Sequence, residues 1–462
     1  MVMSAAAHGG ATPSEPEPEP DAGESAAEPE AEGEDSALLR EYTRYGISLA
    51  GLLYVRETFA GIADGHTTSD VCQTVIKRLT LPGGWRTQPE LTDAANRYYR
   101  HTYFPVPAEG EAGGEGAPQP TAPPGTKSMC QVLEEDPATR RFVGRPTHFL
   151  SHAWVFLFLN VLSGLQHFVA QLPADEPEPF FWFDCFVLDQ HAQSSQGAEW
   201  WRTTFMRAIG GIGHTVMMLS PWSSPVPLTR SWCLWELYCS HASGARFSVC
   251  LGQAEQEAFH EAIVRDADVV LAAFAAIDVR AAEAGDPADR GRILSAVEET
   301  VGSARLNAIA IAELRQWVVG EARAALRSAS VSGRTQIGRL FRQLGLLREA
   351  QEVLEATVGA AEEESLDLGV ACRALANVYQ EQGDYPKALE YYGKSLGIKI
   401  ASVGEQHLDV GRTYMGMAQT YERQGNLAEA RDLYRKAMAI FRETHGERYT
   451  PWFEEQISRV TE

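Results

Sequence analysis

The feature that most constrains this chain is a sequence repeat near its C-terminal end. Gly383 and Gly425 lie 42 residues apart, and Gly345 occupies the matching position 38 residues before Gly383. At these offsets small residues align with small ones and large with large, in the sets Ala350, Ala388 and Ala430; Phe341, Tyr379 and Tyr421; and Leu354, Tyr392 and Tyr434. Stacked helix-turn-helix units need small residues where helices touch and large ones that fill the gaps. Three copies therefore predict an all-α helical repeat solenoid over residues 331–462.

Two segments carry the pattern most clearly, QEQGDYPKALEYYGKSL at 380–396 and ERQGNLAEARDLYRKAM at 422–438. They resemble tetratricopeptide repeats of the longer, kinesin-light-chain-like kind. The resemblance implies that residues 331–462 bind a protein or peptide partner, or drive self-assembly, without naming that partner. A kinesin-light-chain-like cargo adaptor would explain only this last part of the chain.

The middle of the chain has a different texture, in which short apolar runs alternate with helical stretches. We expect strands at 148–154, 180–189, 215–220 and 245–251, and helices up to 172, at 199–209 and at 231–243. Alternating strands and helices favour right-handed crossovers and a parallel sheet, with any ligand at the carboxyl ends of the strands. Beyond residue 253 the sequence turns helical and Ala-rich. Residues 141–330 are therefore predicted to form an α/β domain with a C-terminal helical extension.

The N-terminal part differs again in composition. Residues 1–36 contain ten carboxylates and no Lys or Arg and are rich in Pro and Ala, which predicts a disordered acidic tail. Residues 37–140 show helical spacing of apolar residues up to about position 103, followed by a Pro/Gly-rich linker at 105–127. The predicted domains are therefore 1–36, 37–140, 141–330 and 331–462.

Charge and hydropathy exclude several classes of partner. The formal net charge of -22 argues against nucleic acid and anionic lipid as partners. The longest apolar stretches, 153–165 and 269–277, are shorter than the roughly 18 residues of a membrane span. The seven cysteines have no paired spacing and no zinc-ligand spacing, which favours a reducing compartment without a metal site. Because the N-terminus also lacks the pattern of a secretory signal, we expect a cytoplasmic protein.

One acidic residue stands out in the segment LTRSWCLWEL at 228–237. Glu236 lies on a predicted helix that is otherwise rich in aromatic residues, with Trp232 four positions before it and Ser240 four after it. A carboxylate beside an indole is partly desolvated, which raises its pKa and is typical of catalytic or ion-pairing groups. From these residues alone, a solvated or ion-paired helix glutamate remains the alternative interpretation.

Three motifs in this region resemble Toll/interleukin-1 receptor (TIR) domains: SHAW at 151–154 after the first strand, FWFD at 181–184 on the second, and the W-C-x-x-E-L pattern formed by Trp232, Cys233, Glu236 and Leu237. The resemblance covers roughly residues 145–251 and implies a flavodoxin-like parallel sheet. It also implies self-association through this domain. The sequence departs from the family at SHAW and in QHAQSSQGAEWW at 190–201, which lacks the usual acidic-then-Gly loop.

Enzymatic members of the TIR family cleave NAD between nicotinamide and ribose, with a catalytic glutamate at the position of Glu236. Nicotinamide is already a cationic leaving group, so one carboxylate that stabilises an oxocarbenium-like state can suffice. The resemblance implies that further residues line the nicotinamide and ribose pocket, namely Ser151, His152, Trp154, Asp184 and Trp232. NAD would be a substrate, and no cofactor is expected. The alternative is a non-catalytic TIR-like and tetratricopeptide adaptor or scaffold.

Overall fold

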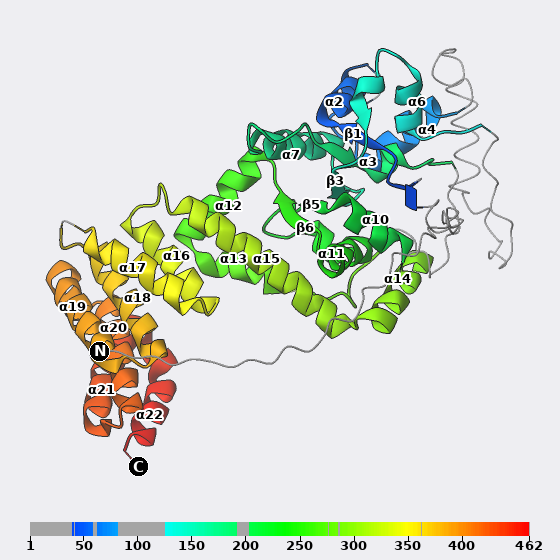
Figure 1. The fold of residues 1–462 in the computed structure, drawn as a ribbon. Coiled ribbons are helices and arrows are strands. Elements are labelled where there is room, and N and C mark those ends of the chain that lie inside the picture. The colour runs from blue at the N-terminus through cyan, green and yellow to red at the C-terminus, as the bar shows by residue number, and fades with distance from the viewer. Residues whose placement is uncertain are drawn as a thin grey trace, which may run out of the picture.

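The computed structural model describes residues 39–40, 42–58, 62–81, 125–191, 203–275, 277–284, 287–361 and 363–461. The predicted acidic tail 1–36, most of the predicted linker and the stretch 192–202 lie outside these residues. Figure 1 shows a sheet with covering helices, drawn in blue to green, beside a stack of helix pairs, drawn in yellow to red. The helical array forms the C-terminal part of the described chain, and the sheet with its covering helices precedes it.

Six strands form one mixed sheet in the order β2-β1-β4-β3-β5-β6. The strands are β1 (Gly46–Ser48), β2 (Val143–Gly144), β3 (His148–Ser151), β4 (Phe180–Trp182), β5 (His214–Met218) and β6 (Arg246–Cys250). Strands β3 to β6 pair in parallel, whereas β1 is antiparallel to both β2 and β4. Within the sheet the four parallel strands lie in the order β4-β3-β5-β6, so the first of them along the chain, β3, occupies an inner position.

Two features differ from the sequence prediction. Strand β1 lies in a region that the sequence predicts to be helical. The prediction missed it because a strand of three buried residues is too short to show alternation of apolar and polar residues. The predicted strand 180–189 ends at Trp182, and the chain continues as helix α8 (Asp184–Val187). The Asp184 carboxylate accepts a hydrogen bond from the Cys185 amide at 2.7 Å in the first turn of this helix. The sheet is therefore mixed rather than purely parallel, and the TIR-type assignment stays a prediction.

Helices cover both faces of the sheet (Figure 1). Helices α2 (Leu49–Thr58) and α7 (Phe158–Ala170) pack together on one side, and α10 (Thr204–Ile212) packs against α11 (Ser231–Ser243) on the other. Smaller elements complete the α/β part: α3 (Thr68–Val71), a π-helical turn (Cys72–Ile76), α4 (Lys77–Leu79), α6 (Met129–Glu135), and 3-10 turns at Arg140–Phe142 and Val226–Thr229. Helix α11 has the bounds that the sequence predicts.

The C-terminal array contains three consecutive helix pairs and a further helix. The pairs are α16 (Val331–Gln343) with α17 (Leu347–Gly359), α18 (Leu366–Gln382) with α19 (Tyr385–Val403), and α20 (Leu408–Arg423) with α21 (Leu427–His445), followed by a 3-10 turn (Gly446–Tyr449) and α22 (Thr450–Arg459). The aligned alanines at 350, 388 and 430 are fully buried. Gly383 turns the chain with φ of 83°, and a Cβ there would meet nothing within 4 Å. The positive φ, rather than close packing, therefore favours glycine at this position.

A helical extension joins the sheet to the array. Helix α12 (Gln253–Arg265) begins shortly after β6 and packs against α16, while α13 (Ala267–Ala275), α14 (Pro287–Thr300) and α15 (Ser303–Ala325) complete the extension. Phe259 of α12 stacks on Trp317 of α15 with ring centroids 4.5 Å apart. One hydrophobic core consequently runs from the sheet into the second helix pair, as far as Tyr392. Among the described residues, no helix is both long and apolar enough to cross a membrane.

Candidate functional site

The first candidate site lies at the carboxyl edge of the parallel strands. Ser151, the last residue of β3, donates a hydrogen bond of 2.6 Å from its Oγ to the Oε2 of Glu236 on α11. One turn further along α11, Ser240 Oγ donates to the Glu236 carbonyl oxygen at 2.7 Å and shares a second hydrogen bond of 2.7 Å with the Thr215 hydroxyl of β5. These bonds fix α11 on the sheet and hold the Glu236 side chain against the end of β3.

A second carboxylate stands at the same edge. Asp184, two residues after β4, accepts a hydrogen bond of 2.6 Å from Trp154 Nε1 to its Oδ2, and its Oδ1 accepts from the Cys185 amide. The negative charge of Asp184 is close enough to raise the pKa of Glu236. Both Asp184 oxygens are thus engaged, and the segment after β3 is tied to the end of β4.

The surroundings of Glu236 change its protonation. The pKa of Glu236 is raised to about 8, chiefly because the carboxyl group is buried; the hydrogen bond from Ser151 lowers it, and the charge of Asp184 adds a smaller upward effect. A carboxyl group with this pKa is largely protonated at pH 7 and ionises in mildly alkaline solution. The Glu236 side chain nevertheless keeps partial contact with solvent. Such a group can donate a proton when neutral or stabilise a positive charge when ionised.

His152 and Trp232 are the other two residues predicted to contact substrate. His152 is only 7% exposed, and burial lowers its pKa, so its ring is neutral. Its Nε2 has no hydrogen-bond partner among the described residues, and the ring packs edge-on against Phe183 with centroids 4.7 Å apart. Trp232 is half-buried and lies edge-on to Phe205.

The structure therefore brings Ser151, Trp154, Asp184 and Glu236 together at one edge, with His152 and Trp232 close in sequence to them. This gathering follows from parallel strands ending at a common edge, each followed by a polar residue. No group of three or more metal-ligating side chains occurs in the part of the chain that the structure describes. Whether these residues act on a substrate stays a prediction.

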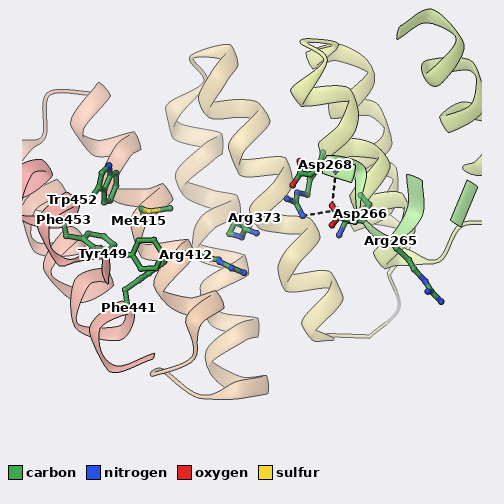
Figure 2. Close-up of a pocket in the computed structure, with 12 residues that line it drawn as sticks. Arg265, Asp266, Asp268, Arg373, Arg412, Met415, Phe441, Tyr449, Trp452 and Phe453 are labelled. Carbon is green, nitrogen blue, oxygen red and sulfur yellow. Dashed lines mark hydrogen bonds between the residues drawn. The ribbon is translucent and has the colours of Figure 1, made fainter. Parts of the chain in front are cut away.

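Sequence reasoning missed a second candidate site, a groove of about 790 Å³ along the helical array (Figure 2). We call it the arginine groove. Its lining residues are Arg265, Asp266, Asp268, Gln336, Arg339, Arg373, Arg412, Met415, Phe441, Tyr449, Trp452 and Phe453. They come from α12 and α13, from the first helix of all three pairs, and from the C-terminal helices. The groove therefore spans the whole array and includes the junction with the α/β part.

Three arginines occupy the middle of the groove, one from each helix pair. Arg339 Nη1 donates to Gln336 Oε1 at 3.1 Å, and Arg412 Nη1 donates to Asp409 Oδ1 at 3.2 Å. Arg373 lies next to Arg412 in Figure 2, and the charges of both Arg339 and Arg412 act on it. Burial and the charge of Arg339 lower the pKa of Arg373, and its Nε has no hydrogen-bond partner among the described residues.

The two ends of the groove differ in character. At one end, Trp452 and Tyr449 are 38% and 36% exposed and cluster with Phe441 and Phe453. At the other, Asp268 Oδ1 accepts a hydrogen bond of 2.5 Å from Gln343 Nε2, near Asp266. An occupant of the full groove would meet aromatic rings, then guanidinium groups, then carboxylates.

The repeat alignment could not reveal the arginines, because they do not occupy equivalent positions. The 42-residue offset that superposes Gly383 on Gly425 places Arg373 opposite Met415. Met415 also lines the groove, so the alignment finds the groove-facing position without its charge. A comparison of the residues that share the groove-facing side of each helix, rather than of residues at equivalent repeat positions, could have found the site.

Comparison with known proteins supports the assignment of the array. Residues 367–443 match the tetratricopeptide repeat family. Among solved structures, BtubC (BKLC) from P. vanneervenii is 16% identical with a TM-score of 0.28 and covers 45% of this chain and 80% of its own. A Podosopora anserina structure of kinesin light chain nearly identical TPR-like repeats is 18% identical with a TM-score of 0.26, covering 42% of this chain and 96% of its own. No curated protein matches the chain.

Proposed function

We propose that this protein is a scaffold that binds an extended segment of a partner protein in the arginine groove. The tetratricopeptide repeats at 367–443 suggest a protein-binding role. The observation that carries the proposal is the groove itself, which crosses all three helix pairs and combines exposed aromatic rings with guanidinium groups. Aromatic and arginine side chains are the residues most often responsible for binding energy at protein interfaces.

A peptide-binding measurement tests this function. Fluorescent degenerate peptide pools are titrated against the full-length protein and against Trp452→Ala, which removes an exposed ring from the aromatic end. Saturable binding by the wild-type protein, weakened about tenfold or more by Trp452→Ala, is expected if this ring is a binding anchor. Arg348→Glu on α17 is the matched control, because Arg348 is exposed and does not line the groove. Equal binding by all three proteins would contradict the proposal.

A second candidate function is cleavage of NAD at the sheet edge, favoured by the convergence of Glu236, Ser151 and Asp184. In this proposal the bond between ribose and nicotinamide breaks, and the ionised Glu236 carboxylate stabilises the positive charge on the ribose. Water then adds to the ribose and releases a proton, giving nicotinamide and ADP-ribose. Ser151 would position the carboxylate rather than touch the substrate, since its hydroxyl already binds Glu236.

Release of nicotinamide from NAD by the purified protein tests this candidate. Glu236→Gln should lower the rate by roughly 10²-fold to 10⁴-fold, because the amide cannot supply the negative charge. Glu257→Gln, an exposed change on α12, serves as the control. If the wild-type protein releases no nicotinamide, the α/β part is a non-catalytic component of the scaffold, and TIR-like self-association is the role left to test.

A further inference from the structure

Arg373, which lines the arginine groove, is a charged residue without an ion-pair partner among the described residues. Its Nε is screened from solvent and has no hydrogen-bond partner among the described residues, and none of the ion pairs formed by those residues includes it. Charged side chains are rarely buried in folded proteins unless they are paired, because removing a charge from water is costly. A partly buried arginine whose Nε is shielded from water and unpaired, and which has no ion-pair partner among the described residues, therefore points to an anionic ligand in this open groove.

The neighbouring groups do not neutralise Arg373. Asp409 is the nearby carboxylate, but it pairs with Arg412 at 3.2 Å. Lys399, fully buried behind the groove, donates to Thr413 Oγ1 at 3.2 Å and adds to the positive charge whenever it is protonated. Arg339 on the other side interacts with the neutral Gln336. The middle of the groove thus holds three guanidinium groups and one carboxylate.

This excess of two positive charges indicates the charge of the ligand. Over the full lining, four arginines face two aspartates, and Asp409 beside Arg412 reduces this balance to one positive charge, so the excess is concentrated at the three central arginines of a chain whose overall charge is -22. One carboxylate side chain would neutralise half of that excess. A phosphate monoester carries about -1.5 to -2 at pH 7, and its oxygens match the planar, forked geometry of guanidinium groups.

We propose that Arg373, with Arg339 and Arg412 on either side, forms a phosphate subsite, so that the arginine groove binds a partner segment carrying a phosphorylated side chain. The inference rests on the proposed scaffold function and specifies its ligand. The aromatic end of the groove supplies a contact for an apolar residue of the same segment, which distinguishes a phosphorylated protein from a free phosphate compound. Phosphorylation of the partner would then control its recruitment.

The test uses full-length protein and three degenerate peptide pools that differ only at a fixed central residue: phosphoserine, glutamate or serine. The phosphoserine pool should bind at least about tenfold more tightly than the glutamate pool. Inorganic phosphate should displace it, whereas sodium chloride at equal ionic strength should not. If inorganic phosphate competes for the groove and the surrounding peptide makes no difference to binding, the ligand is a free phosphate compound, and the proposal is overturned.

Variants of Arg373 provide the second arm. Arg373→Met removes the charge and keeps most of the apolar bulk, so it should abolish the preference for phosphoserine over glutamate. Arg373→Lys keeps the charge without the forked geometry and should retain only part of that preference. The control Arg348→Met should keep all of it. Thermal melts check that each variant folds. The competition with inorganic phosphate uses the wild-type protein, so it tests the proposal even if a variant does not fold.

Failure of this proposal is distinguishable from failure of the scaffold function. If the glutamate pool binds as tightly as the phosphoserine pool, the groove binds protein segments but the phosphate subsite is wrong. Retention of the phosphoserine preference by Arg373→Met leads to the same conclusion. If none of the three pools binds, the scaffold function itself is contradicted.

Discussion

The Ser151 hydroxyl donates a hydrogen bond of 2.6 Å to Glu236, joining the end of β3 to the second turn of α11. Ser151 is fully buried, so this hydrogen bond has little competition from water. The contact opposes the effect of burial on the pKa of Glu236. The Ser151 hydroxyl thus lowers the pKa of Glu236, the only acidic residue on α11.

The raised pKa of Glu236 predicts how its replacement changes stability with pH. Its pKa is about 8 in the folded protein and about 4.5 in the unfolded chain, so between these pH values the folded state holds the extra proton. Stability from this group is present at low pH and is lost as pH rises toward 8. Glu236→Gln, which stays neutral, should therefore raise the melting temperature relative to wild type more at pH 9 than at pH 5. Equal shifts at both pH values would contradict the buried-acid interpretation.

If Glu236 acts on NAD in its ionised form, the rate of nicotinamide release should rise with pH, with a midpoint near pH 8, and level off at higher pH. Ser151→Ala removes a contact that lowers the pKa of Glu236, so the midpoint of the profile should move to higher pH. The pH profile of the rate for both proteins is the measurement. A shift in the opposite direction would show that Ser151 does not position the carboxylate.

Acid should destabilise the opposite edge of the sheet through a histidine pair. His148 and His214 have ring centroids 4.4 Å apart, and burial lowers their pKa values to about 4 and about 3. The unfolded chain takes up these protons near pH 6.5, so stability should fall as pH falls from about 6.5 to 4. His148→Phe should reduce this loss in urea unfolding curves. The control His445→Gln, at an exposed position, should not.

Two glycines of the helical array make a matched pair for a packing test. A Cβ on Gly416 would lie 2.6 to 2.7 Å from atoms of the Tyr392 ring, whereas a Cβ on Gly393 would meet nothing within 4 Å. Gly416→Ala should therefore destabilise the array by about 1–3 kcal/mol through overpacking. Gly393→Ala should stabilise it by about 0.5–1 kcal/mol, since both glycines are helical. Chemical denaturation followed by circular dichroism measures both effects, and equal effects would contradict the Tyr392 contact.

The junction at α12 predicts how fragments behave. From sequence we expect residues 331–462 to fold alone, because three repeats are enough to bury a continuous core. In the structure α16 also packs on α12, where the Gly333 backbone approaches Val264. A fragment 331–462 should show a cooperative helical melt, and fragment 253–462 should melt at a higher temperature. Identical melting temperatures would show that α12 adds nothing to the array.

The sequence was most informative where side chains repeat in register. Ala388 and Ala430 identified the close helix contacts of the array, and apolar runs located β3, β5 and β6 within a few residues. Strand β1 escaped detection because three residues are too few to show alternation. The arginine groove escaped because Arg373 and Met415 share a repeat position but differ in charge, and only the folded array aligns Arg373 with Arg339 and Arg412.

Helix α12 follows β6 after two residues and supports α16 directly. Each residue added to or removed from an α-helix turns whatever follows it by about 100° and shifts it by about 1.5 Å. An insertion of one residue within α12 would therefore change the orientation of the arginine groove relative to the sheet. The length of α12 therefore sets the orientation of the helical array relative to the sheet. We expect insertions in the surrounding loops to be tolerated far more readily than insertions between residues 253 and 265.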